Sequence, residues 1–460
     1  MLIRPIRATG MSTRLFGTDG VRGTPGEPPL DERTLARLGA AVVRMHSGAG
    51  ASVQVLIGRD TRESGEWITA QLARGIESET GSVTDGGLLS TPAVAFLTRD
   101  GEFDAGIVVS ASHNPFRDNG VKVITGDGEK ADDDLEARIT ALVTDETWAV
   151  PDTPVPSVES IAFSESYIAH TSRILNGVTV PADLRIAIDC ANGATSQLAP
   201  AVLRGLGLDP IVLHDRPDGR NINLDCGSTH PEHLARVVVE QGCRLGAAFD
   251  GDGDRVVFVD HRGTLVNGDA VLLIAARRLA AAGRLPREAV VATVMSNIGL
   301  EHALRAAGIA VHRCSVGDRL VWAEMNRRGI ALGGEQSGHT IFADHLATGD
   351  GLATTLVIVR AVIETGRELA DLAADLVPLP QVLVNVRVRQ RTALAKLLEV
   401  SRLIKKAERD LVGKGRVLVR YSGTEPLLRI MIEGPDQEAI QRLAETIAAR
   451  VRVDLGEGAS

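Results

Sequence analysis

Short apolar runs alternate with amphipathic helical patterns along most of this chain, and this alternation restricts the fold more than any other feature. Residues 53–60 (VQVLIGRD) read as a buried strand that ends in a polar loop. Apolar residues at helical spacing flank it: Leu35, Leu38, Val42 and Met45 before it, and Ile68, Leu72 and Ile76 after it. Further strand-like runs lie at 106–110, 185–189, 245–250, 256–260 and 289–294. Strands that alternate with helices favour α/β domains with parallel or mixed sheets.

Interruptions of this pattern predict the domain boundaries. Residues 150–157 (VPDTPVPS) read as a linker, residues 376–381 (LVPLPQ) mark a second break, and a softer boundary lies near residue 262. After the second break the pattern changes to strand, long helix, two strands and a last helix. That helix carries Ile440, Leu443, Ile447 and Val451 on one face. A length of 460 residues suits the four resulting segments, which are 1–157, 158–262, 263–378 and 379–460.

Composition excludes several classes of function. The net charge is −9 and there is no basic tract, so nucleic acid and membrane are not expected as partners. No apolar run is long enough to span a membrane, and the N-terminus lacks a signal-like apolar core. The four cysteines form no CxxC pair and match no zinc module, which indicates reduced cysteines in a cytoplasmic protein. Met11 is an alternative to Met1 as the start.

The strongest local signal is FDGDGDRVVFVD at 249–260, where Asp250, Asp252 and Asp254 alternate with glycines between two strands. Glycine lets the backbone curl so that the three carboxylates converge. Three hard oxygen ligands suit Mg²⁺, and we expect one ion per chain. A solvated acidic turn is the bland alternative, but three carboxylates at this spacing repel one another unless a cation joins them. A calcium loop of the EF-hand type needs an acidic twelfth residue, where this chain has His261.

Two further loops indicate binding of phosphate and of a polyol. RYSGTEPLLR at 420–429 offers hydroxyls and free backbone N–H groups, and arginines flank them. The residues expected to bind are Arg420, Ser422, Gly423, Thr424 and Arg429. LGGEQSGHTIF at 332–342 displays Glu335 and Ser337, which suit sugar hydroxyls, and His339, which could move protons near neutral pH. Each of these loops taken alone is more simply a turn or a structural loop.

The segment VSASHNPFRDNGVK at 109–122 places Ser112 in a sharp polar turn after an apolar run. A serine at the end of a strand is usually only a turn residue or a helix cap. A magnesium loop, a phosphate loop and a polyol loop in the same chain change this interpretation and predict phosphoryl transfer through Ser112. Lys122 and His339 are then candidates for the general acid and base.

At this point the chain resembles the α-D-phosphohexomutase superfamily over roughly residues 14–453. The motifs occur in the order typical of that superfamily: RLFGTDGVRG, SASHNPFRDNGVK, DCANGAT, NINLDCGSTH, DGDGDR, VGDR, GGEQSGH, TGDG and RYSGTEPLLR. The resemblance implies four domains around a central cleft, three of them α/β with mixed sheets and a C-terminal one α+β. Two departures are the extension before RLFGTDG and Tyr421, which replaces the commoner proline.

The resemblance also implies roles for individual residues. Ser112 would be modified to phosphoserine and would bind the metal ion together with Asp250, Asp252 and Asp254. Arg22, Lys122 and His339 would be catalytic, Glu335 and Ser337 would hold sugar hydroxyls, and the 420–429 loop would hold the phosphate that does not react. A sugar bisphosphate would be the intermediate and the activator.

The expected reaction interconverts glucosamine 6-phosphate and glucosamine 1-phosphate and so supplies UDP-N-acetylglucosamine. GEQSGH is similar to the amino-sugar branch of the superfamily, whereas the neutral-sugar branch tends towards GEMSGH. A phosphomannomutase or phosphoglucomutase of the same superfamily is the alternative. A non-catalytic sugar-phosphate sensor is a third reading, which the intact serine, lysine and aspartates oppose. A homodimer is a further expectation.

Overall fold

A computed structural model describes residues 15–17, 19–46, 52–154, 164–422 and 426–456. The expected alternative start at Met11 and part of the expected linker at 150–157 therefore lie outside the described residues. The chain divides into two compact units, Met1–Met295 with Ile309–Ala374, and Ser296–Gly308 with Asp375–Ser460. Among the described helices, none has the length and apolar character needed to cross a membrane.

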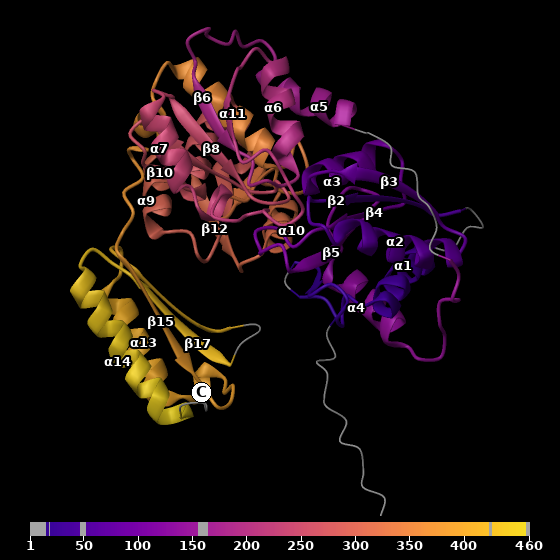
Figure 1. Cartoon of the computed structure of the whole chain (residues 1–460). Helices are drawn as coiled ribbons and strands as arrows, with labels where there is room; N and C mark the ends of the chain where they lie inside the picture. The colour runs from indigo at the N-terminus through magenta and orange to yellow at the C-terminus, as the bar shows by residue number, and fades with distance from the viewer. Residues whose placement is uncertain (1–14, 18, 47–51, 155–163, 423–425, 457–460) are drawn as a thin grey trace, which may run out of the picture. The chain divides into compact units, whose positions relative to one another are not determined.

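The first sheet, drawn in indigo to purple in Figure 1, has the strand order β1-β5-β4-β2-β3. Strand β2 pairs in parallel with β3 and with the central strand β4, whereas β4 pairs antiparallel with β5 and β5 with β1, so the sheet is mixed. The strands are β1 (Val21–Gly23), β2 (Gln54–Arg59), β3 (Ser82–Leu88), β4 (Ala105–Val109) and β5 (Asn119–Thr125).

Helices cover both faces of this sheet. Alternate strand residues such as Val55, Ile57 and Ile107 pack with one group of helices in a single core, since successive side chains of a strand point to opposite faces. That group is α1 (Glu32–His46), α2 (Gly65–Ser78) and α4 (Asp133–Thr144). The other face receives α3 (Thr91–Asp100), whose Val94 lies against Gly58 and Gly106.

The second sheet repeats this arrangement in the order β10-β9-β8-β6-β7, with β6 parallel to β7 and β8. Its strands are β6 (Ile186–Asp189), β7 (Ile211–Leu213), β8 (Leu245–Phe249), β9 (Val256–Asp260) and β10 (Leu265–Val266). Its helices are α5 (Ser164–Ser172), α6 (Thr195–Gly205) and α7 (Glu232–Glu240). Because β10 pairs with β9, this sheet continues to Val266, past the boundary expected near residue 262.

The third sheet has the order β12-β11-β13-β14 and is also mixed, since β14 runs antiparallel to β13. Its strands are β11 (Ala289–Thr293), β12 (Ala310–Cys314), β13 (Leu332–Gly334) and β14 (Thr340–Phe342). The helices of this region are α8 (Gly268–Ala281), α10 (Asp318–Arg328), α11 (Gly351–Thr365) and α12 (Leu369–Ala373). The short turn between β13 and β14 carries the GEQSGH segment.

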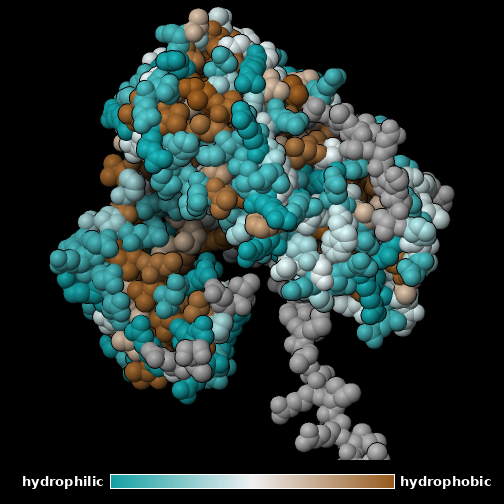
Figure 2. Space-filling model, viewed as in Figure 1, coloured by the Kyte–Doolittle hydropathy of each residue, from teal (hydrophilic) through white to brown (hydrophobic). Residues whose placement is uncertain are grey.

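The C-terminal unit is an antiparallel sheet of order β15-β17-β16 packed against helices. Its elements are β15 (Gln381–Arg387), α13 (Leu398–Asp410), β16 (Arg416–Tyr421), β17 (Leu427–Glu433) and α14 (Gln437–Leu455), joined by α9 (Ile298–Ala306) from earlier in the chain. Figure 2 shows apolar surface on the visible face of this unit, and Leu383, Leu398 and Val412 are among its exposed apolar side chains.

The predicted fold class is confirmed, since three α/β regions with mixed sheets precede a C-terminal α+β region. Each strand expected from the sequence forms within about two residues of its expected position. The expected order after residue 381 also forms, and Ile440, Ile447 and Val451 are buried while Leu443 is half-buried.

The close packing of α1 on α2 generates the first prediction. A Cβ at Gly75 would lie 1.8 Å from the carbonyl oxygen of Ala36, so the two helix backbones touch there. Gly75→Ala should therefore destabilise the protein by about 2 kcal/mol or more, because the helices must move apart. Gly205→Ala in α6 is the matched control, since nothing lies within 4 Å of the added carbon and alanine favours the helix. Thermal unfolding of both variants checks this, and an equal melting temperature for the two would contradict it.

Candidate active site

Ser112 lies in the turn after β4 with a backbone φ of 52°, in the left-handed region that a non-glycine residue adopts only at a cost. The side chain is fully buried. The Ser112 N–H donates to Ser110 Oγ at 2.9 Å, and its hydroxyl donates to Asp250 Oδ2 at 2.5 Å. The turn therefore aims this hydroxyl at the aspartate loop.

A buried arginine and an asparagine hold this turn in place. Arg62 donates to the carbonyl oxygens of Ser112 at 3.0 Å and Asn114 at 2.8 Å, and Asp60 pairs with it at 2.9 Å. Asn223 donates through Nδ2 to the same two carbonyl oxygens at 2.9 and 3.1 Å. No role was predicted for Arg62 or Asn223 from the sequence. For Arg62, the available signal was its pairing with Asp60, which ends the strand-like run 53–60.

The aspartate loop joins β8 to β9, and two glycines allow its shape. Gly253 has a φ of 72°, and a Cβ at Gly251 would lie 2.6 Å from the carbonyl oxygen of Ser112. One carboxylate oxygen from each of Asp250, Asp252 and Asp254 lies within 4.8 Å of the other two, and all three residues are buried. The convergence expected from the glycine spacing is present.

The three carboxyl groups differ in their electrostatic surroundings. Burial, and then the charges of Asp252 and Asp254, raise the pKa of Asp250 well above its usual range. Burial also acts on Asp254, but Lys122 and His339 outweigh it and hold the pKa of Asp254 well below that range.

Two buried oxygens of this loop, Asp252 Oδ1 and Asp254 Oδ1, make no hydrogen bond with any part of the chain that the structure describes. Buried carboxylate oxygens without donors are suited to a divalent cation with hard oxygen ligands. The residues present therefore fit a metal ion.

Lys122 on β5 is fully buried among carboxylates. Its Nζ lies 2.8 Å from Asp252 Oδ2, 3.1 Å from Asp19 Oδ2 and 3.5 Å from Asp254 Oδ2. Burial disfavours the ammonium, yet Asp19 and Asp252 outweigh it and raise the pKa of Lys122. Lys122 therefore holds its proton in this arrangement.

The turn between β13 and β14 brings a third loop to the site. His339 Nδ1 lies 3.7 Å from Asp254 Oδ1, and His339 Nε2 accepts the Gly349 N–H at 3.0 Å. Glu335 is buried and accepts the Gly317 N–H at 3.1 Å. Ser337 in the same turn is exposed. Loops from three different sheets therefore supply Ser112, the aspartates and His339.

A second lysine, which our sequence analysis did not single out, belongs to the same charge network. Lys130 lies 3.1 Å from Asp19 Oδ1 and 3.6 Å from Asp254 Oδ2, and it forms a short contact with Asp318. Asp318 belongs to the VGDR motif, and its Oδ2 lies 3.7 Å from His339 Nε2. The VGDR motif marked Asp318 in the sequence, but it did not indicate that Asp318 lies near Lys130 and His339.

Two arginines border the site. Arg22 on β1 pairs with Asp19 at 2.5 Å and lies 3.4 Å from Asn114 Oδ1. Arg255 lies 3.2 Å from His113 Nδ1. Burial, and then the charges of Arg255 and Arg22, lower the pKa of His113, so its ring favours the neutral form.

In the C-terminal unit, Arg420 on β16 lies directly opposite Arg429 on β17. Burial and the Arg429 charge lower the pKa of Arg420. Like charges at opposite positions of a sheet disfavour each other, and an anion bound between them would relieve this. Ser422 is buried, whereas Gly423 and Thr424 lie outside the described residues. Tyr421, the departure noted in the sequence, donates its hydroxyl to the Thr392 carbonyl oxygen at 2.6 Å.

Four family models, described as phosphoglucomutase/phosphomannomutase, match successive parts of the chain. Domain I matches residues 13–150, domain II matches 165–263, domain III matches 267–379 and the C-terminal domain matches 383–450. The chain belongs to this family. The superfamily expected from the motifs is thereby confirmed.

Similar proteins cover nearly the whole chain. Phosphoglucosamine mutases from Solibacter usitatus and Moorella thermoacetica are each 47% identical to it, over 97% and 94% of this chain and 100% and 97% of theirs. A family member from Burkholderia thailandensis has a similar structure, with a TM-score of 0.78 at 24% identity over 96% of this chain and 98% of that one. N-acetylphosphoglucosamine mutase from Aspergillus fumigatus, in complex with GlcNAc-6P and magnesium, gives a TM-score of 0.64 at 19% identity over 95% of both chains. These two structures show the fold.

The opposite pKa shifts of two aspartates generate the second prediction. In chelator-treated protein at neutral pH, Asp254→Asn should lower stability by about 3 kcal/mol or more, because Lys122 and His339 lose a buried partner. Asp250→Asn should leave stability unchanged or raise it, because an amide avoids the repulsion that raises the Asp250 pKa.

The pH dependence follows from the same shifts. The Asp250 pKa is raised on folding, so its contribution to stability is lost as pH rises through the folded value. The Asp254 pKa is lowered, so its contribution is complete above the unfolded value of about 4 and is lost only under stronger acid. Thermal unfolding between pH 5 and 8 should therefore show a flatter profile for Asp250→Asn than for the parent, and identical profiles would contradict this assignment.

Proposed function

We propose that this chain is a phosphoglucosamine mutase that interconverts glucosamine 6-phosphate and glucosamine 1-phosphate through a phosphoserine at Ser112. The single observation that carries the proposal is the buried Ser112 hydroxyl, held 2.5 Å from Asp250 in a left-handed turn beside three carboxylates. The full-length likeness to phosphoglucosamine mutases supports the choice of substrate.

The reaction proceeds in two transfers. Phosphoserine 112 gives its phosphoryl group to the free sugar hydroxyl, so the Ser112 O–P bond breaks, an O–P bond to the sugar forms and the hydroxyl proton passes to a base. The bisphosphorylated sugar then turns round, and Ser112 takes the phosphoryl group from the other end. Lys122 holds its proton among carboxylates and acts as the acid, while His339, near Asp254, accepts a proton.

The three aspartates would hold Mg²⁺ together with the phosphorylated Ser112. When bound, the ion would neutralise part of the negative charge on the phosphoryl group during its transfer. The buried Oδ1 atoms of Asp252 and Asp254, which make no hydrogen bond within the described residues, support this assignment. Arg22 would contact the phosphoryl group from β1, where it lies beside Asn114 of the serine loop.

The remaining loops would bind substrate. Glu335 is buried in the turn that carries His339 and would accept a sugar hydroxyl, with Ser337 beside it in sequence. Arg420, Ser422, Gly423, Thr424 and Arg429 would bind the distal phosphate. We propose the domain limits 1–157, 158–262, 263–378 and 379–460, each domain carrying one of these loops, and a cytoplasmic location.

The third prediction concerns the nucleophile. Intact-mass analysis of the phosphorylated form should show one phosphate, mapped to Ser112, and the dephosphorylated protein should be nearly inactive until a sugar bisphosphate is added. Ser112→Ala should lose most turnover. Ser110→Ala is the control, because it removes the hydroxyl that orients the Ser112 N–H but keeps the nucleophile. Phosphate on Ser110 instead would overturn the mechanism.

The substrate is tested by parallel coupled assays with glucosamine 6-phosphate, glucose 1-phosphate and mannose 1-phosphate. We expect the highest kcat/KM for glucosamine 6-phosphate. A much higher kcat/KM for a neutral sugar would favour the alternative, a phosphoglucomutase or phosphomannomutase on the same fold. No turnover of any of the three by phosphorylated protein would favour a sensor.

The fourth prediction concerns the metal ion. A phosphoryl group adds a charge of about −1.5 to −2 beside the three aspartates, so the phosphorylated protein should bind Mg²⁺ more tightly than the dephosphorylated protein. Isothermal titration of both forms measures the difference. Excess chelator should abolish turnover, and Asp252→Asn should nearly do so. Equal Mg²⁺ affinities would show that the phosphoryl group is not a ligand.

A further inference from the structure

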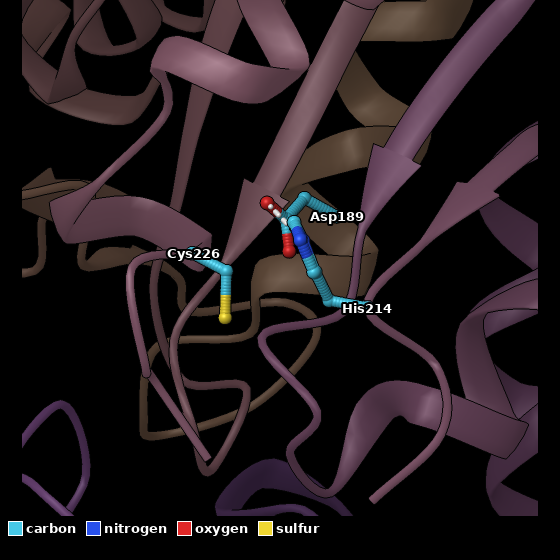
Figure 3. Close-up of side chains that lie close together, drawn as sticks. All are labelled: Asp189, His214 and Cys226. Carbon is cyan, nitrogen blue, oxygen red and sulfur yellow. Dashed lines mark ion pairs between the residues drawn. The ribbon is translucent and has the colours of Figure 1, made fainter. Parts of the chain in front are cut away.

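A second group of metal-ligating side chains lies at the edge of the second sheet, outside the site described above. Asp189 ends β6, His214 follows β7, and Cys226 lies in the loop before α7. Because β6 and β7 run parallel with Asp189 opposite Leu213, the residue after Leu213 emerges beside Asp189 at the carboxyl edge. Figure 3 shows the three side chains at these strand ends.

The three side chains are close enough to share one ion. Asp189, His214 and Cys226 each offer an atom within 4.8 Å of the other two, and Asp189 Oδ2 lies 3.0 Å from His214 Nδ1, the contact dashed in Figure 3. Tetrahedral zinc spaces its nitrogen, oxygen and sulfur ligands roughly 3.3–3.8 Å apart. Asp189 and Cys226 are fully buried, and His214 is mostly buried.

The orientation of the His214 ring is the second observation. His214 Nδ1 faces the Asp189 carboxylate at 3.0 Å, and this contact is the main cause that raises the pKa of His214, so a cation shared by the two groups is favoured there. The other ring nitrogen, Nε2, lies 3.4 Å from His233 Nδ1. The space between Nδ1 and the carboxylate can be filled in two ways. A proton on Nδ1 can be donated to Asp189, or, with the ring proton on Nε2 facing His233, the Nδ1 lone pair and the carboxylate can bind one metal ion.

Two backbone N–H groups hold the Asp189 carboxylate in place, as is common in protein metal sites. Asp189 Oδ1 accepts the Ala191 N–H at 2.9 Å, and Oδ2 accepts the Gly227 N–H at 3.0 Å. Metal-binding carboxylates are commonly fixed by such donors, and a metal-binding histidine commonly donates its other N–H, here towards His233.

We propose that Asp189, His214 and Cys226 bind a divalent transition-metal ion, with Zn²⁺ as the preferred ion and water as the fourth ligand. A carboxylate, an imidazole and a thiolate together suit zinc and are unlike the all-oxygen set of the aspartate loop. The Zn–S bond forms as the S–H bond of Cys226 breaks, and that proton leaves to solvent. The carboxylate and thiolate charges then balance the ion.

The thiol makes the site selective. The Cys226 sulfur lies within 4.8 Å of ligand atoms of Asp189 and His214, so it is placed to bind the same ion. A sulfur ligand favours Zn²⁺ over Mg²⁺, which prefers oxygen ligands. Metal binding would also restrain the segment between β7 and α7. Asn223 of this segment donates a hydrogen bond to the carbonyl oxygen of Ser112.

Cobalt titration of the full-length protein tests the proposal. The protein is stripped with chelator, dialysed and kept in excess Mg²⁺, so that the aspartate loop does not compete. Co²⁺ should give one equivalent of thiolate-to-cobalt charge-transfer absorption in the near ultraviolet, and Zn²⁺ should remove it. The aspartate loop contains no sulfur and cannot produce this band.

Two cysteine variants and one histidine variant sharpen the test. Cys226→Ser should abolish the band, whereas Cys243→Ser, a buried cysteine before β8 in the same sheet, should keep it. His233→Ala should weaken Zn²⁺ binding by about 10- to 100-fold, because it removes the partner that orients His214. Zn²⁺ should raise the melting temperature of the parent but not of Cys226→Ser.

Two results would overturn the proposal, one in the parent protein and one in the Cys226→Ser variant. Absence of the band in the parent would mean that a proton on His214 is the shared cation. Survival of the band in folded Cys226→Ser would place the metal on another cysteine. Either result refutes the assignment.

Discussion

The structure depends most on the burial of three carboxylates in one tight loop. Asp250, Asp252 and Asp254 lie out of water, and the charge of Lys122 compensates only part of theirs. Removing charges from water is costly unless they are paired, so the surrounding elements must supply partners. Strand β5 supplies Lys122 and the turn after β13 supplies His339. The three sheets are thereby fixed to one another around this loop.

Much of the fold could be predicted because the alternation of apolar runs and helical stripes is a local property. The β2 strand follows from the apolar run at 53–60. Its flanking helices follow from the helical spacing of Leu35 and Leu38 before it and of Ile68 and Leu72 after it. Pairing between strands was harder, because it depends on contacts far apart in sequence. The two-residue strand β10 shows this, since it joins the second sheet although its residues carry no clear strand pattern.

The candidate site was predictable where chemistry is concentrated in one motif. The aspartate loop and Ser112 converge as expected, since three carboxylates spaced by glycines repel one another unless a cation joins them, which made that motif distinctive. Arg62, Asn223 and Lys130 could not be found in this way. Each acts through contacts with backbone carbonyls or with carboxylates from distant segments, and a single arginine, asparagine or lysine in a loop has no distinctive spacing.

The second sheet presents two contrasting ligand sets along one carboxyl edge. Asp250 directly follows β8, and Asp189 ends the neighbouring strand β6. The first set contains only oxygen and lies beside Lys122, so it suits an ion with hard oxygen ligands. The second set combines oxygen with nitrogen and sulfur, so it suits a transition-metal ion such as zinc. Asn223 connects the two sets. It belongs to the segment that metal binding at the second set would restrain, and it donates a hydrogen bond to the turn of Ser112. A retained ion in the second set would therefore stabilise the strained backbone on which the first depends.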